Sequence, residues 1–295
     1  MNTLKIYGVT TRISPFTSNG LLDCFLQNVS RVFNDNKIDI RMLMPKYGHI
    51  SDRKYILREV IRLREIPVPI GNDEELMPSV KSAFIPDTKV QVYFLVFPDQ
   101  TPENKVTLNF DYEGSNRNYY ETCMALLNLV GIETLRHLYW QPDLVFVTNW
   151  QLSLLPFLLN EKYSKDPWFE GTRPVLILSA DEPFQTFDRE ILDGYGIKSE
   201  NHNLCDPIDY FCLALENSVG IILLENSEDN KIASYLEDSR VAKILEAKGE
   251  QFMKIKIEAP HAEPKDEEPK DAAPKDAIDY WGAIATDVYG FLSNL

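Results

Sequence analysis

Residues 142–156 read Pro142-Asp-Leu-Val-Phe-Val-Thr-Asn-Trp-Gln-Leu-Ser-Leu-Leu-Pro156, and they give the clearest indication of how this chain folds. Their apolar run from Leu144 to Val147 is long enough for one buried strand of a parallel sheet. Thr148 and Asn149 follow, and both can cap a helix. Apolar residues then recur at helical spacing, at Trp150, Leu154, Leu155 and Leu158. The stretch therefore predicts a strand, a turn and a helix. It puts polar side chains at the carboxyl end of the strand, where open α/β sheets bind ligands.

The same alternation of strands and helices runs through most of the chain. Residues 4–10 predict a strand, the apolar spacing of residues 21–33 predicts a helix, and residues 38–44 predict a second strand. This β-α-β unit implies a parallel pair of strands. Further strand-like runs are 60–70, 90–97, 175–178 and 219–224, and further helical runs are 119–138 and 208–215. The pattern predicts an α/β fold with a single Rossmann-like, doubly wound, mostly parallel sheet over residues 1–259.

The composition changes near residue 260. Three copies of a five-residue unit, each ending in Pro-Lys-Asp, fill residues 262–276. A proline in every fifth position forbids a continuous helix, and the shortage of apolar residues forbids a core, so residues 260–277 predict a disordered charged spacer. Residues 278–295 predict an amphipathic helix, which we expect to dock on its own domain or, as the alternative, on a partner. Its apolar stripe consists of Trp281, Ile284, Val288, Phe291, Leu292 and Leu295.

Composition limits the function classes. The chain has 295 residues and a net charge of −15, which argues against nucleic acid and anionic membranes as partners. No apolar run approaches the roughly 20 residues that span a bilayer, and no signal-peptide pattern is visible, so we expect a cytoplasmic protein. The four cysteines and four histidines lack metal-ligand spacing. We therefore expect no metal and no cofactor, and we interpret Cys24 and Cys212 as buried free thiols.

Four segments, in order, resemble the amino-terminal half of bacterial glycogen and starch synthases. Residues 14–23 (SPFTSNGLLD) are similar to the family's P-F-x-K-T-G-G-L-x-D turn, and residues 41–50 (RMLMPKYGHI) to its R-V-L-L-P-x-Y-x-x-I. Residues 142–156 resemble P-D-V-V-H-A-H-D-W-H-x-x-L-x-P, and residues 171–185 resemble G-T-x-x-V-F-T-I-H-N-L-A-Y-Q. The resemblance spans residues 4–225. It implies one half of the two-domain GT-B fold, with ADP-glucose held mainly by a second domain that follows in the family.

This chain also differs from the family's motifs at several positions. The turn at residues 14–23 keeps Gly20 and Asp23 but has neither the family's second glycine nor its lysine. Glycines and a cation are what a phosphate-binding turn needs, so we expect a poor diphosphate site there. The family's active-site histidine positions read Thr148 and Ser179, which can form hydrogen bonds but cannot supply charge or shuttle protons.

No residue is therefore assigned a catalytic role. The residues expected to line a vestigial substrate cleft are Ser18, Asn19, Gly20, Asp23, Tyr47, Thr148, Asn149, Gln151 and Gln185. For Trp150 a role in the core is favoured over stacking on a sugar. For Gln151 and Gln185 a plain surface position is the alternative. The aromatic group Tyr112, Tyr119, Tyr120 and Trp140 is interpreted as packing.

Three functions stay open. The first is a catalytically inactive, synthase-like pseudoenzyme in glycogen metabolism that acts as an interaction or regulatory protein. The second is a module with weak residual binding of a glucan or a nucleotide sugar. The third is a retaining ADP-glucose:glucan glucosyltransferase, active alone or as one half of a split enzyme completed by a separate second domain.

Overall fold

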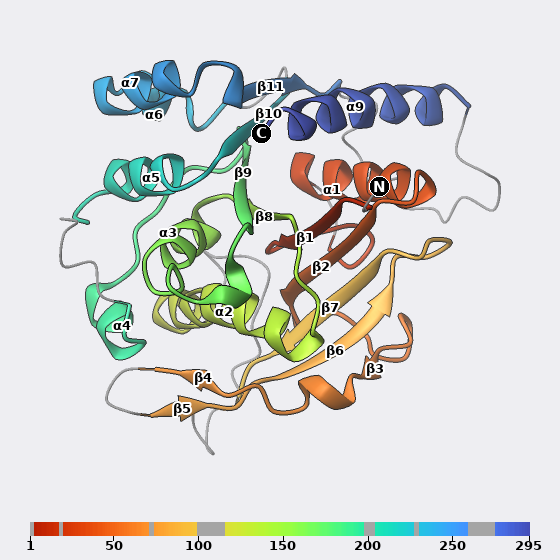
Figure 1. The fold of residues 1–295 in the computed structure, drawn as a ribbon, viewed down its shortest axis with the longest axis vertical. Helices are drawn as coiled ribbons and strands as arrows, with labels where there is room; N and C mark the ends of the chain where they lie inside the picture. The colour runs from red at the N-terminus through yellow and green to blue at the C-terminus, as the bar shows by residue number, and fades with distance from the viewer. Residues whose placement is uncertain are drawn as a thin grey trace.

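The computed structural model describes residues 3–17, 20–70, 74–98, 116–197, 204–226, 230–258 and 275–295. A nine-stranded sheet crosses the molecule in the order β11-β10-β9-β8-β1-β2-β7-β6-β3 (Figure 1). Its strands are β1 (Lys5–Val9), β2 (Asp39–Pro45), β3 (Arg58–Glu59), β6 (Ser79–Phe84), β7 (Gln91–Val96), β8 (Leu144–Thr148), β9 (Arg173–Ser179), β10 (Gly220–Glu225) and β11 (Phe252–Lys256). A separate antiparallel pair joins β4 (Val68–Pro69) to β5 (Glu75–Leu76).

The sheet is parallel except at one edge, where β6 runs antiparallel to β7 and to β3. Tyr7 of β1 pairs with Arg41 of β2 on one side and with Val145 of β8 on the other. The chain builds one side of the sheet from β1 to β3 and then returns to β8, so the strand order reverses between β1 and β8. Such a reversal leaves a crevice at the carboxyl ends of the strands, and this is where α/β proteins bind ligands. The predicted α/β, Rossmann-like, mostly parallel fold is confirmed.

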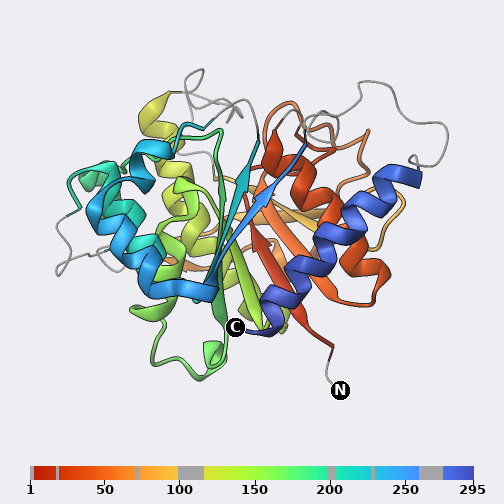
Figure 2. The ribbon, with the colours of Figure 1, turned by 90° about the horizontal axis from the view of Figure 1, so that it is seen from above.

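Helices cover both faces of the sheet (Figure 2). On one face lie α1 (Leu21–Asp35) and α9 (Lys275–Ser293). On the other lie α2 (Arg117–Leu138), α3 (Leu154–Asn160), α5 (Pro207–Glu216) and α7 (Ser239–Lys248). Short helices complete the connections: α4 (Arg189–Gly194), α6 (Ala233–Leu236), η1 (Ile61–Leu63), η3 (Trp150–Leu152), η4 (Pro167–Phe169) and η5 (Gly249–Gln251).

Within residues 142–156, the strand β8 is fully buried. All five residues of β8 are buried, because helices cover both of its faces. The turn after it differs from the predicted simple helix start. Asn149 has a φ of 52°, and the chain makes the 3₁₀ helix η3 before α3 begins at Leu154. Trp150 is buried against the rings of Tyr120 and Phe187, so its interpretation as a core residue is confirmed.

Residues 60–70 do not form the predicted strand. The structure places η1 and then the two-residue strand β4 there, and the backbone N–H of Ile66 donates to the carbonyl of Pro78 at 3.0 Å. The reason lies in Pro67 and Pro69, which have no N–H to donate to a ladder and so interrupt a long strand.

The C-terminal helix α9 packs along α1 on its own domain, and both views show the two helices side by side (Figures 1 and 2). Its inward side chains are buried, and Tyr289 meets Phe33 of α1 edge to face at 6.5 Å. The helix begins at Lys275 rather than at residue 278. The spacer predicted before it lies outside the described residues from 260 to 274. The buried side chains of α9 are Trp281, Ile284, Ala285, Val288 and Leu292.

The remaining predictions concern single side chains. Cys24 is a buried free thiol as predicted, whereas Cys212 is only half-buried. Tyr120 and Trp140 are buried, as expected for packing residues, and Tyr112 lies outside the described residues. None of the helices in the described part of the chain has the length and apolar character that crossing a bilayer requires.

Candidate functional site

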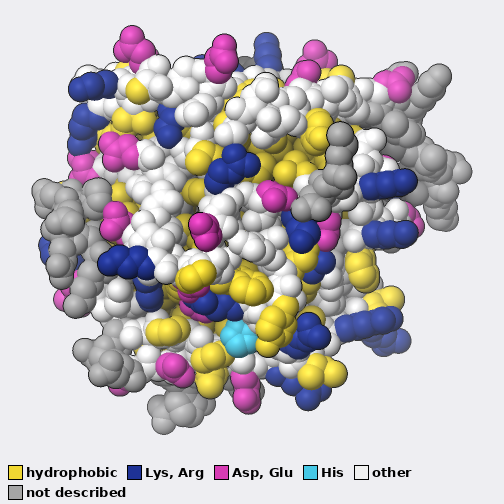
Figure 3. Space-filling model, in the orientation of Figure 1, with side chains coloured by type: hydrophobic (Ala, Val, Ile, Leu, Met, Phe, Trp, Pro, Cys, Tyr) yellow, Lys and Arg dark blue, Asp and Glu magenta, His cyan; other side chains and the backbone are white. Residues whose placement is uncertain are grey.

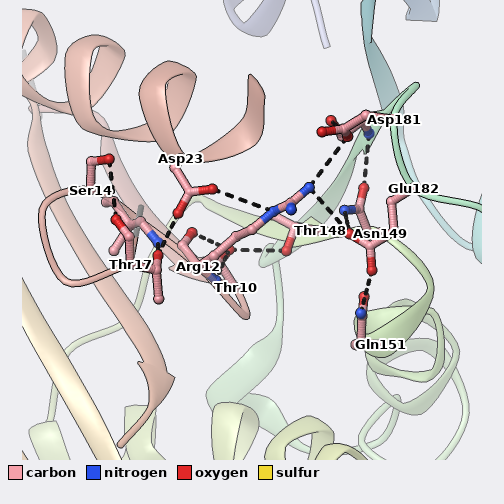
Figure 4. A network of polar contacts seen from close by, with 12 residues as sticks. Thr10, Arg12, Ser14, Thr17, Asp23, Thr148, Asn149, Gln151, Asp181 and Glu182 are labelled. Carbon is pink, nitrogen blue, oxygen red and sulfur yellow. Dashed lines mark hydrogen bonds and ion pairs between the residues drawn. The ribbon is translucent and has the colours of Figure 1, made fainter. Parts of the chain in front are cut away.

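Polar side chains from three neighbouring strands meet at the switch point of the sheet (Figure 4). They come from the carboxyl ends of β1, β8 and β9 and from the first turn of α1. We call this set the Arg12 network. Its members are Thr10, Arg12, Thr17, Asp23, Thr148, Asn149, Gln151, Ser179, Asp181 and Glu182.

One guanidinium group stands at the centre of the network. Nη2 of Arg12 lies 3.3 Å from Oδ1 of Asp181 and 3.3 Å from Oε2 of Glu182, and Nε lies 3.6 Å from Oδ2 of Asp23. The Arg12 side chain is only 11% exposed, and that of Asp23 is fully buried. The charge of Arg12 is therefore shared among three carboxylates, in a place with little water to screen them.

Two amides hold the carboxylates in place. Asn149 accepts the backbone N–H of Ser179 through Oδ1 at 2.8 Å and donates through Nδ2 to Glu182 at 2.6 Å. Gln151 also donates to Glu182, through its other carboxylate oxygen, and the Ser179 hydroxyl donates to Asp181. Asn149 has a φ of 52° and a ψ of −167°, and its amide oxygen accepts from β9 instead of capping the following helix.

The hydroxyl groups of Thr148 and Thr10 also form hydrogen bonds within the network. Oγ1 of Thr148 donates to Oγ1 of Thr10 at 3.1 Å, and both side chains are fully buried. Thr10 in turn accepts the backbone N–H of Arg12 at 3.2 Å, which sets the direction in which that residue leaves β1.

The turn before α1 contributes Thr17 to the network, beside Asp23. The Thr17 hydroxyl donates to Asp23 and accepts the backbone N–H of Ile13 at 2.9 Å. Gly20 is the N-cap of α1, and a Cβ atom there would lie 2.7 Å from Oδ2 of Asp23 and 3.1 Å from Nη1 of Arg12. Glycine is therefore required by close approach to the ion pair, since its φ of −150° is open to any residue.

Burial shapes the titration of the network. It raises the pKa of Asp23, and the opposing effects of Arg12 and of the Thr17 hydroxyl offset only part of that rise. Burial alone would lower the pKa of Arg12, but Glu182, Asp23 and Asp181 outweigh it, so the guanidinium stays charged. Burial also raises the pKa of Tyr47 well above its ordinary value, and the neighbouring Tyr120 and Glu182 add to this effect.

The structure brings together most of the predicted cleft residues. Gly20, Asp23, Thr148, Asn149 and Gln151 belong to the network or touch it. Tyr47 is completely buried and stacks on His49, so it backs the site and presents no surface to a ligand. Gln185 is half-buried on the loop after β9, and Ser18 and Asn19 lie outside the described residues.

Residues 14–23 contain no lysine or arginine, but a cation from outside the turn lies beside Gly20. Arg12 approaches Gly20 from the end of β1, six residues before the position at which a lysine was sought. Asp181 and Glu182 were missed as well. One signal could have found them, since Arg12 and Asp181 each stand within three residues of the end of a predicted strand. Parallel strands end at one edge of the sheet, so such residues can meet.

Among the described residues, no group of three or more histidine, cysteine, aspartate or glutamate side chains is arranged to hold a metal ion. The carboxylates of the network instead face a guanidinium.

Comparisons with known proteins agree with this fold. Residues 5–223 match the family described as the starch synthase catalytic domain. The glycogen synthase of Chlorobium luteolum is 30% identical over 223 residues, which cover 72% of this chain and 44% of that protein. The glycogen synthase of Chlorobium phaeovibrioides is 28% identical over 219 residues, with the same coverage of 72% and 44%. The chain thus spans about half the length of the curated relatives it matches.

A solved structure shows the same fold. The catalytic domain of starch synthase IV from Arabidopsis thaliana, bound to ADP and acarbose, superposes with a TM-score of 0.68 at 14% identity. The match covers 86% of this chain and 51% of that one, in agreement with the predicted half of a GT-B fold. On the family match over residues 5–223, this chain belongs to the starch synthase catalytic domain family.

Proposed function

We propose that this chain is a non-catalytic member of its family that acts as an interaction or regulatory protein. We also propose that its cleft has at most weak affinity for nucleotide sugars and glucans. The observation that carries the proposal is the pairing of Arg12 with Asp23, Asp181 and Glu182.

The charge of the network opposes a diphosphate. One guanidinium group against three carboxylates leaves two negative charges when all four groups are ionised. A sugar nucleotide would bring further negative charge into a site where burial reduces screening. Arg12 could pair with a phosphate only by leaving its carboxylates, and stranding buried charges in this way is costly. We therefore expect a dissociation constant for ADP-glucose in the millimolar range or weaker, about −4 kcal/mol or less favourable.

The polar groups at the family's histidine positions are also already engaged. Thr148 donates to Thr10, and Ser179 donates to Asp181. Unlike imidazole, hydroxyl groups of this kind do not act as general acids or bases near neutral pH, and here they would have to break internal hydrogen bonds before contacting a substrate. This arrangement favours a structural role for the network over glucosyl transfer.

Weak binding of a neutral sugar is compatible with the same groups. Carboxylates and amides such as Glu182 and Asn149 are ordinary partners for sugar hydroxyl groups, and a neutral glucan adds no charge. The expected affinity is low because the amide groups of Asn149 and Gln151 already donate hydrogen bonds to Glu182.

The test is transfer of radiolabelled glucose from ADP-glucose to glycogen by the purified chain, together with calorimetric titration of ADP-glucose and maltoheptaose. We expect no transfer above a protein-free control. A matched pair of variants separates charge from shape. Asp181→Asn with Glu182→Gln removes two of the three negative charges beside Arg12, and it should strengthen ADP binding if charge is the obstacle. Exposed Asp193→Asn should leave ADP binding unchanged. Transfer by the wild type that is lost on substitution of Arg12 would contradict the proposal.

Glucosyl transfer from ADP-glucose remains the second candidate function, favoured by the family match and by relatives named glycogen synthase. The chain covers only about 44% of those relatives, so this activity would be completed by a second domain, in the same or a separate chain. Adding the carboxyl-terminal half of a relative as a separate protein tests it. Transfer that appears only in the mixture would favour a split enzyme over an interaction protein.

A further inference from the structure

A basic surface lies at the edge of the sheet farthest from β11. Residues 46–64, which lead from β2 through β3 to η1, contain six lysine or arginine residues and two aspartate or glutamate residues, a net charge of +4. The whole chain carries −15, so this segment opposes the overall sign. Figure 3 shows Lys and Arg side chains mixed with hydrophobic ones around β3 and η1. We call this set the β3 surface. Its members are Arg53, Lys54, Ile56, Arg58, Ile61 and Arg62.

The cations of the β3 surface are not neutralised by their neighbours. Arg53, Lys54, Arg58 and Arg62 are exposed, and none of them forms an ion pair with another residue that the structure describes. Nearby Arg64 behaves differently, since its Nη2 lies 3.0 Å from Oε2 of Glu59. The positive potential of the surface is therefore open to a partner.

Ile56 is unusual in two respects. Its φ of 54° places a β-branched residue in the left-handed region, and its side chain is 66% exposed. The N–H of Leu57 donates to the carbonyl of Asp52 at 2.9 Å, so Ile56 ends a helical turn at a position that normally selects glycine. Neither the backbone nor the packing of the chain favours isoleucine there. Ile61, five residues on, is 79% exposed. A β-branched residue kept in a strained and exposed position suggests a contact made outside the chain.

We propose that the β3 surface binds an acidic protein segment that also carries apolar side chains. The proposal rests on the interaction role proposed above and names its partner surface. Four exposed cations that form no ion pair with a described residue fit carboxylates, and Ile56 with Ile61 supplies the apolar contacts. Lys54 and Arg62 lie over the rings of Tyr55 and Tyr139, which leaves their charges unneutralised. A protein segment is favoured over nucleic acid or an anionic bilayer because those extended polyanions would also meet the remaining surface of a chain with net charge −15.

The first test uses a fluorescein-labelled peptide of about 14 residues, in which glutamate alternates with leucine and phenylalanine. Anisotropy should give a dissociation constant of roughly tens of micromolar at low salt, weakened about tenfold at several-fold higher salt. Charge reversal by Arg53→Glu, Arg58→Glu and Arg62→Glu together should abolish binding. A peptide with lysine in place of glutamate should not bind. Equal binding of both peptides, or binding that survives charge reversal, overturns the proposal.

The second test separates binding from stability. Lys37 ends α1 with the same geometry, at a φ of 65°, with the N–H of Ile38 donating to the carbonyl of Phe33 at 2.9 Å. Ile56→Gly and Lys37→Gly should therefore each raise the Tm, by about 2 °C, because glycine adopts this conformation without strain. Only Ile56→Gly should weaken peptide binding, by about fivefold or more. A lower Tm for Ile56→Gly, or unchanged affinity, assigns Ile56 a purely internal role and overturns its part in the surface.

Two further outcomes decide the class of partner and the link to the proposed function. Binding of phosphatidylserine vesicles without binding of the acidic peptide replaces the protein partner by a membrane and overturns the proposal. Glucosyl transfer is measured separately on the same samples. A chain that transfers glucose and also binds the peptide contradicts the proposed function alone, whereas an inactive chain that does not bind the peptide contradicts this inference alone.

Discussion

Arg12 and Asp181 are 169 residues apart in the sequence, and the structure places Nη2 of the first 3.3 Å from Oδ1 of the second. The contact joins the loop after β1 to the loop after β9, across the point where the strand order reverses. In an α/β fold this crevice is where a ligand is expected. Here charged side chains of the protein itself meet at that point, and we expect the free energy of unfolding to depend on the ion pairs between them.

Arg12→Met should destabilise the protein strongly. The substitution keeps much of the side-chain length but leaves Asp23, Asp181 and Glu182 without their counter-ion, and breaking a buried ion pair costs about 3–5 kcal/mol. Urea unfolding measures the loss. Arg64→Met serves as the control, because the Arg64–Glu59 pair is 62% exposed on both sides and should contribute less than about 1 kcal/mol. Similar losses for the two variants would mean that the Arg12 network does not stabilise the fold.

Gly20→Ala should also be destabilising, by about 1–3 kcal/mol. The added methyl group would approach Oδ2 of Asp23 to 2.7 Å, and Asp23 is held by Thr17 and Arg12 and cannot move away freely. Gly194→Ala is the matched control, since a Cβ atom there meets nothing within 4 Å. It lies at the end of α4, where alanine is the better helix former, so its stability should be unchanged or slightly higher.

Much of the fold could be predicted from the sequence because burial leaves a periodic pattern. The apolar run of β8 marks a strand that is covered on both faces, and the helical spacing of α1 and α9 shows which side of each helix faces the core. The prediction for residues 60–70 failed where two prolines override an apolar run. The Arg12 network was only half predicted. Asn149 and Thr148 stand at the end of a recognisable strand, whereas the partners of Arg12 are set by the order of strands in the sheet, which no local pattern contains.

Asp23→Asn should change how stability depends on pH. Burial raises the pKa of Asp23 in the folded protein above its ordinary value of 3.8. As the pH rises from about 3.8, the unfolded chain loses this proton first, so the folded state binds more protons and its stability falls until the folded pKa is passed. The asparagine variant lacks this slope. Urea unfolding from about pH 4 to 7 should show a flatter profile for Asp23→Asn than for the wild type.

The exposed Asp193→Asn serves as the control for that experiment and should follow the wild-type profile. If Asp23→Asn also follows it, Asp23 titrates as an ordinary carboxyl group and burial does not govern it.

The four thiols should differ in reactivity. Burial raises the pKa of Cys24 to about 11 and that of Cys123 to about 12, so at pH 8 their thiolate fractions are about one in a thousand or less. Cys212 is half-buried, and burial raises its pKa to about 11, whereas Cys205 is exposed. Titration of the native protein with a chromogenic disulfide at pH 8 should therefore show one fast thiol, and Cys205→Ser should remove it. Rapid modification of any thiol in Cys205→Ser would contradict the prediction, because the three remaining cysteines are buried or half-buried.

Helix α9 should be part of the cooperative fold. Val288 is fully buried against the domain, and Leu295 lies so close to Gly220 of β10 that a Cβ atom there would approach its methyl group to 2.7 Å. Val288→Asp would bury an unpaired carboxylate, which we expect to cost about 3–5 kcal/mol or to detach the helix and expose its apolar stripe. Thr286→Asp, two residues away on the exposed side, should change stability by no more than about 0.5 kcal/mol.

Thermal unfolding and light scattering measure the effects of both substitutions. Removal of residues 259–295 should likewise lower the Tm and promote aggregation. If Val288→Asp unfolds like the wild type and stays monodisperse, α9 is not held by the domain, and capture of a partner becomes the better explanation for its apolar face.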